Sequence, residues 1–259
     1  MKKAIIGIIV AAVVAGGGFG IYKMVSSSSQ DKTLQDSAQE ADKTVQTTQT
    51  TEATTAPTTT TDSHSVASTQ TLTPEQAIAK LKEGNERFVN DKSEVTNVDS
   101  ATRKSLEAGQ HPFATVVACS DSRVTPTTVF NQGLGQIFDV RLAGDVVDDS
   151  ALGSIEYAVD HLNTPVVVVM GHEKCGAVTA AYDQVVKGQQ AHGHIEDLVD
   201  EIEPAVNKNG TVDDAIRQNV VNVVNEIKAD PIVAKAIKEG KVQVVGAYYN
   251  LDGHVTFTN

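Results

Sequence analysis

The sequence predicts an α/β fold with a mostly parallel central β-sheet flanked by helices. Two observations predict it: short Val- and Ile-rich runs that are apolar at every position, and stretches of helical periodicity between them. Continuous apolar strands suit a parallel sheet that is covered on both faces, and alternating strands and helices build such a sheet. The predicted strands are residues 115–118, 137–142, 166–170 and 242–247, and the predicted helices are residues 150–161, 177–186, 195–206 and 212–227.

The folded domain is predicted to span residues 73–259, beginning with a helix. Thr73 is suited to an N-cap and Pro74 to the first helical position, and Gln76 can complete a capping box. The helical stretch AIAKLKEGNERFV follows directly. Before it, residues 26–72 are dominated by Ser, Thr, Gln and Ala, so they are predicted to form a disordered Ser/Thr-rich linker.

Residues 1–25 are predicted to be a membrane anchor or signal segment. Between Lys3 and Lys23 lie 19 uncharged residues, which as a helix would span roughly 28 Å, close to the thickness of a bilayer core. Lys2 and Lys3 supply the positive flank of an export signal, but no convincing Ala-x-Ala cleavage site follows. An uncleaved anchor is favoured over a cleaved signal, and an extracytoplasmic location, anchored or secreted, is expected.

The formal net charge of −12 and the pI near 4.9 argue against electrostatic binding to nucleic acid. The chain has two cysteines, Cys119 and Cys175, too few for a disulfide-rich scaffold. They suit a pair of metal ligands or a single bridge.

Both cysteines lie in motifs that follow predicted strands. CSDSR, residues 119–123, follows one strand, and GHEKCG, residues 171–176, follows another. Carboxyl ends of parallel strands share one edge of the sheet, where such folds bind ligands, so Cys119, His172 and Cys175 form a candidate metal-ligand set. Two thiolates and one imidazole suit Zn²⁺, and three protein ligands leave a fourth position for water. Lone buried His and Cys residues are more often simple packing.

The neighbours Asp121 and Arg123 strengthen the interpretation of a catalytic zinc site. A carboxylate close to the metal can accept a proton from the water that reacts, and an adjacent guanidinium keeps that carboxylate ionised. The alternative is an ordinary surface ion pair.

The two motifs resemble the signatures of the bacterial β-class carbonic anhydrases. The resemblance covers roughly residues 74–258 and includes GNERFV, NQGLGQIFDVRLAG, GSIEYAVDHL and VVGAYYNLDGHV. It implies reversible hydration of carbon dioxide to bicarbonate and a proton by zinc-bound hydroxide, with one zinc ion per chain on Cys119, His172 and Cys175. It also implies that Asp121 and Arg123 orient or gate the fourth ligand.

The resemblance further implies a homodimer or higher homo-oligomer in which a helical arm, residues 74–89, embraces the partner. Gln110, Phe138, Tyr157 and Gly176 occupy the places of the substrate pocket. Family members whose site is closed by bicarbonate carry a different set of residues that includes a Trp, and this chain has no Trp. Gln110 implies the open form of the site, in which Asp121 is paired with Arg123. Asp145 stands where the family often has Asn, a departure that could alter the local electrostatics.

Two alternatives stay open from the sequence. A hydrolase of carbonyl sulfide or carbon disulfide shares this fold and zinc set. A non-catalytic exported protein with a Cys119–Cys175 disulfide would suit an oxidising compartment.

Overall fold

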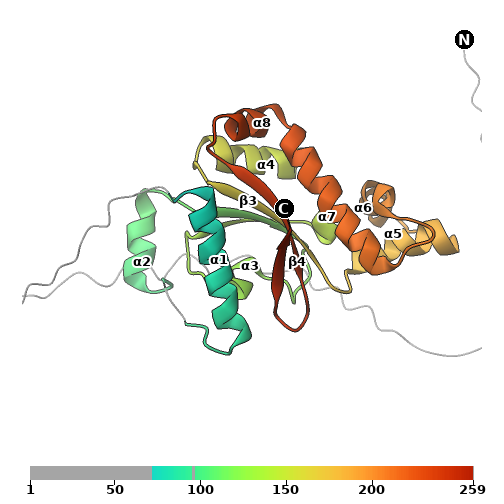
Figure 1. The fold of residues 1–259 in the computed structure, drawn as a ribbon, viewed down its shortest axis with the longest axis horizontal. Helices are drawn as coiled ribbons and strands as arrows, with labels where there is room; N and C mark the ends of the chain where they lie inside the picture. Colours follow the sequence, from blue (N-terminus) through green and yellow to red (C-terminus); the bar gives the residue numbers. More distant parts are fainter. Residues whose placement is uncertain (1–71, 95–96, 259) are drawn as a thin grey trace, which may run out of the picture. The chain divides into compact units, whose positions relative to one another are not determined.

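The computed structural model describes residues 72–94 and 97–258. Within them, one sheet has the strand order β2-β1-β3-β4-β5 (Figure 1). The strands are β1 Ala114–Ala118, β2 Ile137–Arg141, β3 Val166–His172, β4 Gln243–Tyr249 and β5 Val255–Thr258. The pairs β1–β2, β1–β3 and β3–β4 are parallel, and β5 is antiparallel to β4. The predicted mostly parallel sheet is confirmed.

Helices alternate with these strands as predicted, with three additions. The helices are α1 Pro74–Val89, α2 Ser100–Ser105, α3 Pro126–Val129, α4 Asp149–Asp160, α5 Gly176–Lys187, α6 Ile195–Ile202, α7 Val212–Ala229 and α8 Pro231–Lys238. The sequence did not predict α2, α3 or α8. The stretch predicted as one helix over residues 195–206 changes to a 3₁₀ turn at Glu203–Ala205, because Pro204 has no N–H to continue the α-helix.

The sheet is covered on both faces (Figure 1). One apolar cluster joins α1 and α3 to the sheet, and a second joins α4, α7 and α8 to its opposite face. All seven residues of β3 are buried, as expected for a central strand covered from both sides. A third cluster joins α5 and α6 to the edge where β1 and β3 end, and it contains Cys119 and Cys175.

The N-terminal helix packs against the sheet of its own chain. The predicted capping box is present: Gln76 N–H donates to Thr73 Oγ1 at 3.3 Å, and Thr73 N–H donates to Gln76 Oε1 at 2.9 Å. Leu81 is fully buried in the first cluster. Asn85 donates to Gly253 O at 2.8 Å and accepts from Val255 N–H at 3.0 Å, so α1 also holds the β4–β5 turn. Contact of α1 with a partner subunit stays a prediction.

The predicted anchor, residues 1–25, and the predicted linker, apart from residue 72, lie outside the described residues. Among the residues that are described, no helix combines the length and the apolar character needed to cross a membrane.

Replacing Gly84 by Ala is expected to destabilise the fold by at least about 3 kcal/mol, the upper range for overpacking. A Cβ at residue 84 would lie 1.8 Å from the carbonyl oxygen of Phe130, which is backbone and cannot swing aside. Gly153→Ala is the matched control, since apart from its chain neighbours and its own helix backbone no described atom lies within 4 Å of its added Cβ, and Ala is the better helix former. Denaturant unfolding measures both, and equal stability of the two variants would contradict the packing of α1.

Candidate metal centre

Two strand ends bring the two sequence motifs together. Ala118 of β1 is in register with Met170 of β3. Cys119 directly follows β1, and His172 is the last residue of β3. The ligand atoms of Cys119, His172 and Cys175 all lie within 4.8 Å of one another, and all three residues are buried. The structure therefore assembles the predicted ligand set from segments about fifty residues apart in the sequence.

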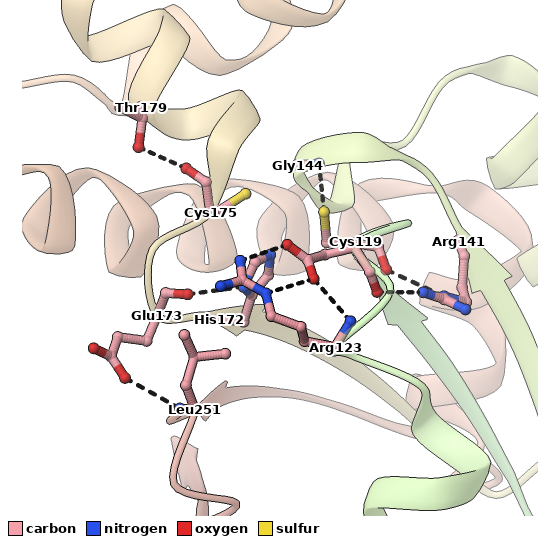
Figure 2. A network of polar contacts seen from close by, with 10 residues as sticks. Cys119, Arg123, Arg141, Gly144, His172, Glu173, Cys175, Thr179 and Leu251 are labelled. Atoms are coloured by element: carbon pink, nitrogen blue, oxygen red, sulfur yellow. Dashed lines mark hydrogen bonds and ion pairs between the residues drawn. The ribbon is translucent and has the colours of Figure 1, made fainter.

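A tight turn carries the third of these residues into place (Figure 2). Lys174 adopts a left-handed φ of +57°, which reverses the chain after β3. Cys175 then occupies the N-cap position of α5, and Thr179 Oγ1 donates to Cys175 O at 2.7 Å. The turn is also tied to β4 by a bond of 2.9 Å from Glu173 N–H to Tyr249 O. The position of the Cys175 sulfur is thus set by backbone bonds to both neighbouring elements.

The imidazole of His172 is oriented for ligation. Its Nδ1 lies 3.0 Å from Glu173 O, and because a carbonyl only accepts, Nδ1 carries the proton. The other nitrogen, Nε2, is then an acceptor, and it is buried with no hydrogen-bond partner in the part of the chain that the structure describes. A buried acceptor without a partner is costly, and a metal ion at this point would satisfy it.

The thiols lie in surroundings that favour ionisation of one of them. The adjacent Cys175 thiol, with contributions from His172 and the Gly144 amide, lowers the pKa of Cys119 to about 4, against the opposing effect of burial. Gly144 N–H donates to Cys119 Sγ at 3.3 Å (Figure 2). The pKa of Cys175 is raised by its interaction with Cys119 and by burial. Two sulfurs and an imidazole nitrogen fit Zn²⁺.

Asp121 and Arg123 form a bidentate pair at the mouth of this cluster. Arg123 Nε and Nη2 donate to the two carboxylate oxygens of Asp121 at 2.9 and 2.7 Å. These bonds hold the pKa of Asp121 well below its usual range. Arg141 supports the same loop by donating to Cys119 O at 3.1 Å and to Asp121 O at 2.8 Å. An ionised carboxylate is therefore fixed two residues from a ligand thiol.

The comparisons with known proteins agree with this geometry. A family model described as carbonic anhydrase matches residues 114–255. The chain belongs to the β-carbonic anhydrase family.

"Carbonic anhydrase 2" of Mycobacterium tuberculosis is 40% identical over 185 residues, covering 69% of this chain and 89% of that protein. The carbonic anhydrase of Mycolicibacterium smegmatis is 39% identical over 189 residues, covering 70% and 92%. Among solved structures, the Coccomyxa β-carbonic anhydrase in complex with acetazolamide has a TM-score of 0.55 at 28% identity, covering 69% of this chain and 85% of that one. β-Carbonic anhydrases use zinc, and Cys119, His172 and Cys175 are the group suited to hold it here.

The residues predicted for the carbonic anhydrase substrate pocket are not all brought to the zinc cluster. Gly176 begins α5 directly after Cys175, and Gln110 is exposed in the segment before β1. Phe138 is paired with Thr115, four residues or about 13 Å along the strand from Cys119. Its ring contacts that of Tyr157 at a centroid distance of 6.3 Å. Within one carbonic anhydrase chain, these two aromatics form a separate pair in which Phe138 is half-buried and Tyr157 is exposed.

Four residues that support the carbonic anhydrase site were not singled out from the sequence. They are Arg141, Gly144, Glu173 and Asn219. Arg141 and Gly144 stand in the segment quoted for the family resemblance, so their place was visible but their contacts were not. Asn219 lies on α7, more than forty residues from any ligand in the sequence. No local pattern connects it with the zinc cluster.

Asp145, which departs from the family pattern, is a buried carboxyl beside the zinc cluster. It is 1% exposed, with a left-handed φ of +48° that Asn and Asp tolerate best. Burial, and then the nearby charge of Cys119, raise the pKa of Asp145 well above its usual range, while a hydrogen bond from Asn219 opposes this. The effect of Asp145 on the local electrostatics is therefore that ionising this buried carboxyl costs free energy.

Asp145→Asn is expected to stabilise the protein increasingly as the pH rises. A raised folded-state pKa means that the folded protein binds more protons than the unfolded chain above about pH 4, so wild-type stability falls with pH until the folded pKa is passed. The amide variant lacks this loss. Unfolding free energies of the zinc-loaded protein between pH 5.5 and 8 test the sign, with Asp160→Asn, an exposed carboxylate at the end of α4, as the control. If the difference in unfolding free energy between Asp145→Asn and wild type becomes smaller as the pH rises, the raised pKa of Asp145 is contradicted.

Proposed function

We propose that the chain catalyses the reversible hydration of carbon dioxide to bicarbonate and a proton, with one zinc ion held by Cys119, His172 and Cys175. The observation that carries the proposal is the buried Nε2 of His172, which has no hydrogen-bond partner among the described residues and belongs to a group whose ligand atoms all lie within 4.8 Å of one another. Three protein donors leave one position open, as catalytic zinc sites do.

Zinc bound there would supply a Lewis acid that makes water acidic near neutral pH. Cys119 and Cys175 provide the negative charge that retains a dication, and the Nδ1–H bond to Glu173 O fixes the His172 ring. Asp121 is the acceptor beside this position. Among the described residues its Oδ2 accepts one bond, from Arg123 Nη2. A carboxylate oxygen has room for a second bond, and we assign that place to a proton of the reacting water.

Arg123 has two roles in this proposal. It keeps Asp121 ionised, so that the carboxylate accepts and does not donate. It also occupies both carboxylate oxygens, which prevents Asp121 from turning to ligate zinc itself. The open position is then kept for water and substrate.

The sulfur analogues of carbon dioxide test the substrate assignment. Steady-state hydration of carbon dioxide should exceed hydrolysis of carbonyl sulfide or carbon disulfide in kcat/KM on the same zinc-loaded preparation. A preference for either sulfur compound would make the chain a hydrolase of that compound. The disulfide alternative is not favoured, because Cys119 and Cys175 are both free and the Asp121–Arg123 pair is intact. Mass spectrometry of the alkylated protein checks the thiols.

The place of Phe138 and Tyr157, away from the zinc cluster of their own chain, supports a dimeric site. Tyr157 is 47% exposed, and Phe138 is half-buried beside it. We assign both rings to the apolar wall of a partner subunit's carbon dioxide pocket, with Gln110 and Gly176 as its polar side. Mixing inactive Cys175→Ser protein with a Phe138→Ala/Tyr157→Ala variant should then restore activity through hybrid dimers. No restoration on mixing, with both variants dimeric, would overturn this assignment.

For location, we propose that residues 1–25 anchor the protein and that residues 26–72 hold the enzyme outside the cytoplasm. The support is the uncharged stretch between Lys3 and Lys23 and the polar tract after it. Intact mass of the protein from its native host separates an anchor from a cleaved signal. Protection from protease in intact cells would contradict the extracytoplasmic location.

A further inference from the structure

Helix α7 is docked tightly on the strand that carries His172. A Cβ on Gly171 of β3 would lie 2.6 Å from Val220, and one on Gly246 of β4 would lie 2.9 Å from the same side chain. Val220 is therefore seated over two glycines on neighbouring strands. This close approach fixes the position of α7 along the sheet and, with it, the position of the next residue, Asn219.

Asn219 is 2% exposed, and its side-chain amide makes two bonds toward the ligand loop. Its Nδ2 donates to Gly144 O at 2.8 Å and to Asp145 Oδ2 at 3.3 Å. The orientation of the amide follows from chemistry, since a backbone carbonyl can only accept. The side-chain amide of Asn219 thus donates to two consecutive residues of one loop.

Gly144 is the residue that faces Cys119. Its N–H donates to Cys119 Sγ at 3.3 Å, and its own carbonyl is the oxygen that Asn219 holds. Its φ is +74°, and an added Cβ would lie 2.5 Å from Ile202 Cδ1, so any other residue here would be strained. Gly144 therefore contacts the Cys119 sulfur through its N–H and contacts helix α7 through its carbonyl oxygen.

We propose that Asn219 is a positioning residue for the metal ligand Cys119, acting through Gly144. By holding the Gly144 carbonyl, it keeps the Gly144 N–H aimed at the sulfur, which lowers the electron density on the thiolate and fixes its direction. Hydrogen-bond partners of this kind outside the ligand set are worth about 10- to 100-fold in metal affinity. The inference rests on the proposed zinc site and adds a residue to it from a different helix.

Asn219→Leu removes both N–H donors and keeps a side chain of similar size. Zinc release to a chromophoric chelator is expected to be about 10- to 100-fold faster than in wild type. The thiolate-to-metal charge-transfer band of the cobalt-substituted protein is expected to shift, a change that loose packing alone would not produce. Asn222→Leu, one turn further along α7 and bonded to Gln218, is the matched control and should behave as wild type. Equal release rates and identical bands for both variants would overturn the inference.

A truncation keeps the test decisive if Asn219→Leu does not fold. Asn219→Ala removes the same two N–H donors and brings no larger group into the space beside Gly144 O. Fast zinc release and a shifted band are expected again. Wild-type behaviour of Asn219→Ala would show that the Gly144 bond does not matter. Failure of the zinc site itself is distinguishable, because wild type would then bind no zinc.

Discussion

Cys175→Ser is expected to release zinc and to lower carbon dioxide hydration by more than about 100-fold. That figure is the upper range for losing a partner outside the ligand set, and Cys175 is assigned as a ligand itself. Its sulfur is fully buried, so no other side chain on the surface can replace it. A serine hydroxyl is a weak zinc donor, because it does not ionise near neutral pH. Metal analysis and stopped-flow hydration on the same sample measure both effects.

Val178→Ala controls for damage to the fold near Cys175. Val178 is fully buried in the same apolar cluster, one turn into α5, and the cavity should lower stability by about 1 kcal/mol or more without touching a donor atom. This variant should keep one zinc per chain. Full zinc content in Cys175→Ser would remove Cys175 from the ligand set.

Asp121→Asn is expected to keep zinc and to slow hydration by about 100-fold, the lower range for losing one positioned hydrogen bond to a reacting group. The amide has nearly the same shape, but its NH₂ group cannot accept a hydrogen bond and repels the Arg123 guanidinium that now binds both oxygens. The expected change is in kcat at unchanged zinc content. Stopped-flow kinetics over a range of buffer concentrations separate this step from proton removal by buffer.

Asp160→Asn, an exposed carboxylate at the end of α4, is the control for a change of charge alone. It should leave kcat unchanged. Unchanged kinetics in Asp121→Asn as well would show that the Asp121–Arg123 pair holds the loop and takes no part in catalysis.

Much of this site was predictable because its parts follow local rules. The apolar runs that became β1 and β3 end directly at Cys119 and His172, so the shared edge of a parallel sheet placed the ligands together. Asp121 and Arg123 are near neighbours of Cys119, and their pairing is local. In contrast, β5 has four residues with alternating exposure, and it is a strand because it pairs with β4. No periodicity marks so short a strand.

Contacts between distant segments were not predictable in the same way. Helix α8 begins one residue after α7, with Asp230 serving as the end of one helix and the N-cap of the next. A single residue between helices gives little sign of a break. Asn219 lies in an amphipathic helix where an Asn usually faces solvent, and it is buried because α7 sits over Gly171 and Gly246. The place of Phe138 and Tyr157 was not predictable from local pattern either, because the role proposed for them depends on a second copy of the chain.

The most direct test is zinc titration of the metal-free protein, followed by carbon dioxide hydration at each step. The thiols are first kept reduced and the zinc is removed by a chelator. We expect no catalysis without metal, then a linear rise in rate that ends at one zinc per chain, with Cys175→Ser giving no rise. Fast hydration by the metal-free protein, or zinc bound at one per chain with no hydration, would contradict the assignment of Cys119, His172 and Cys175 as the catalytic zinc site.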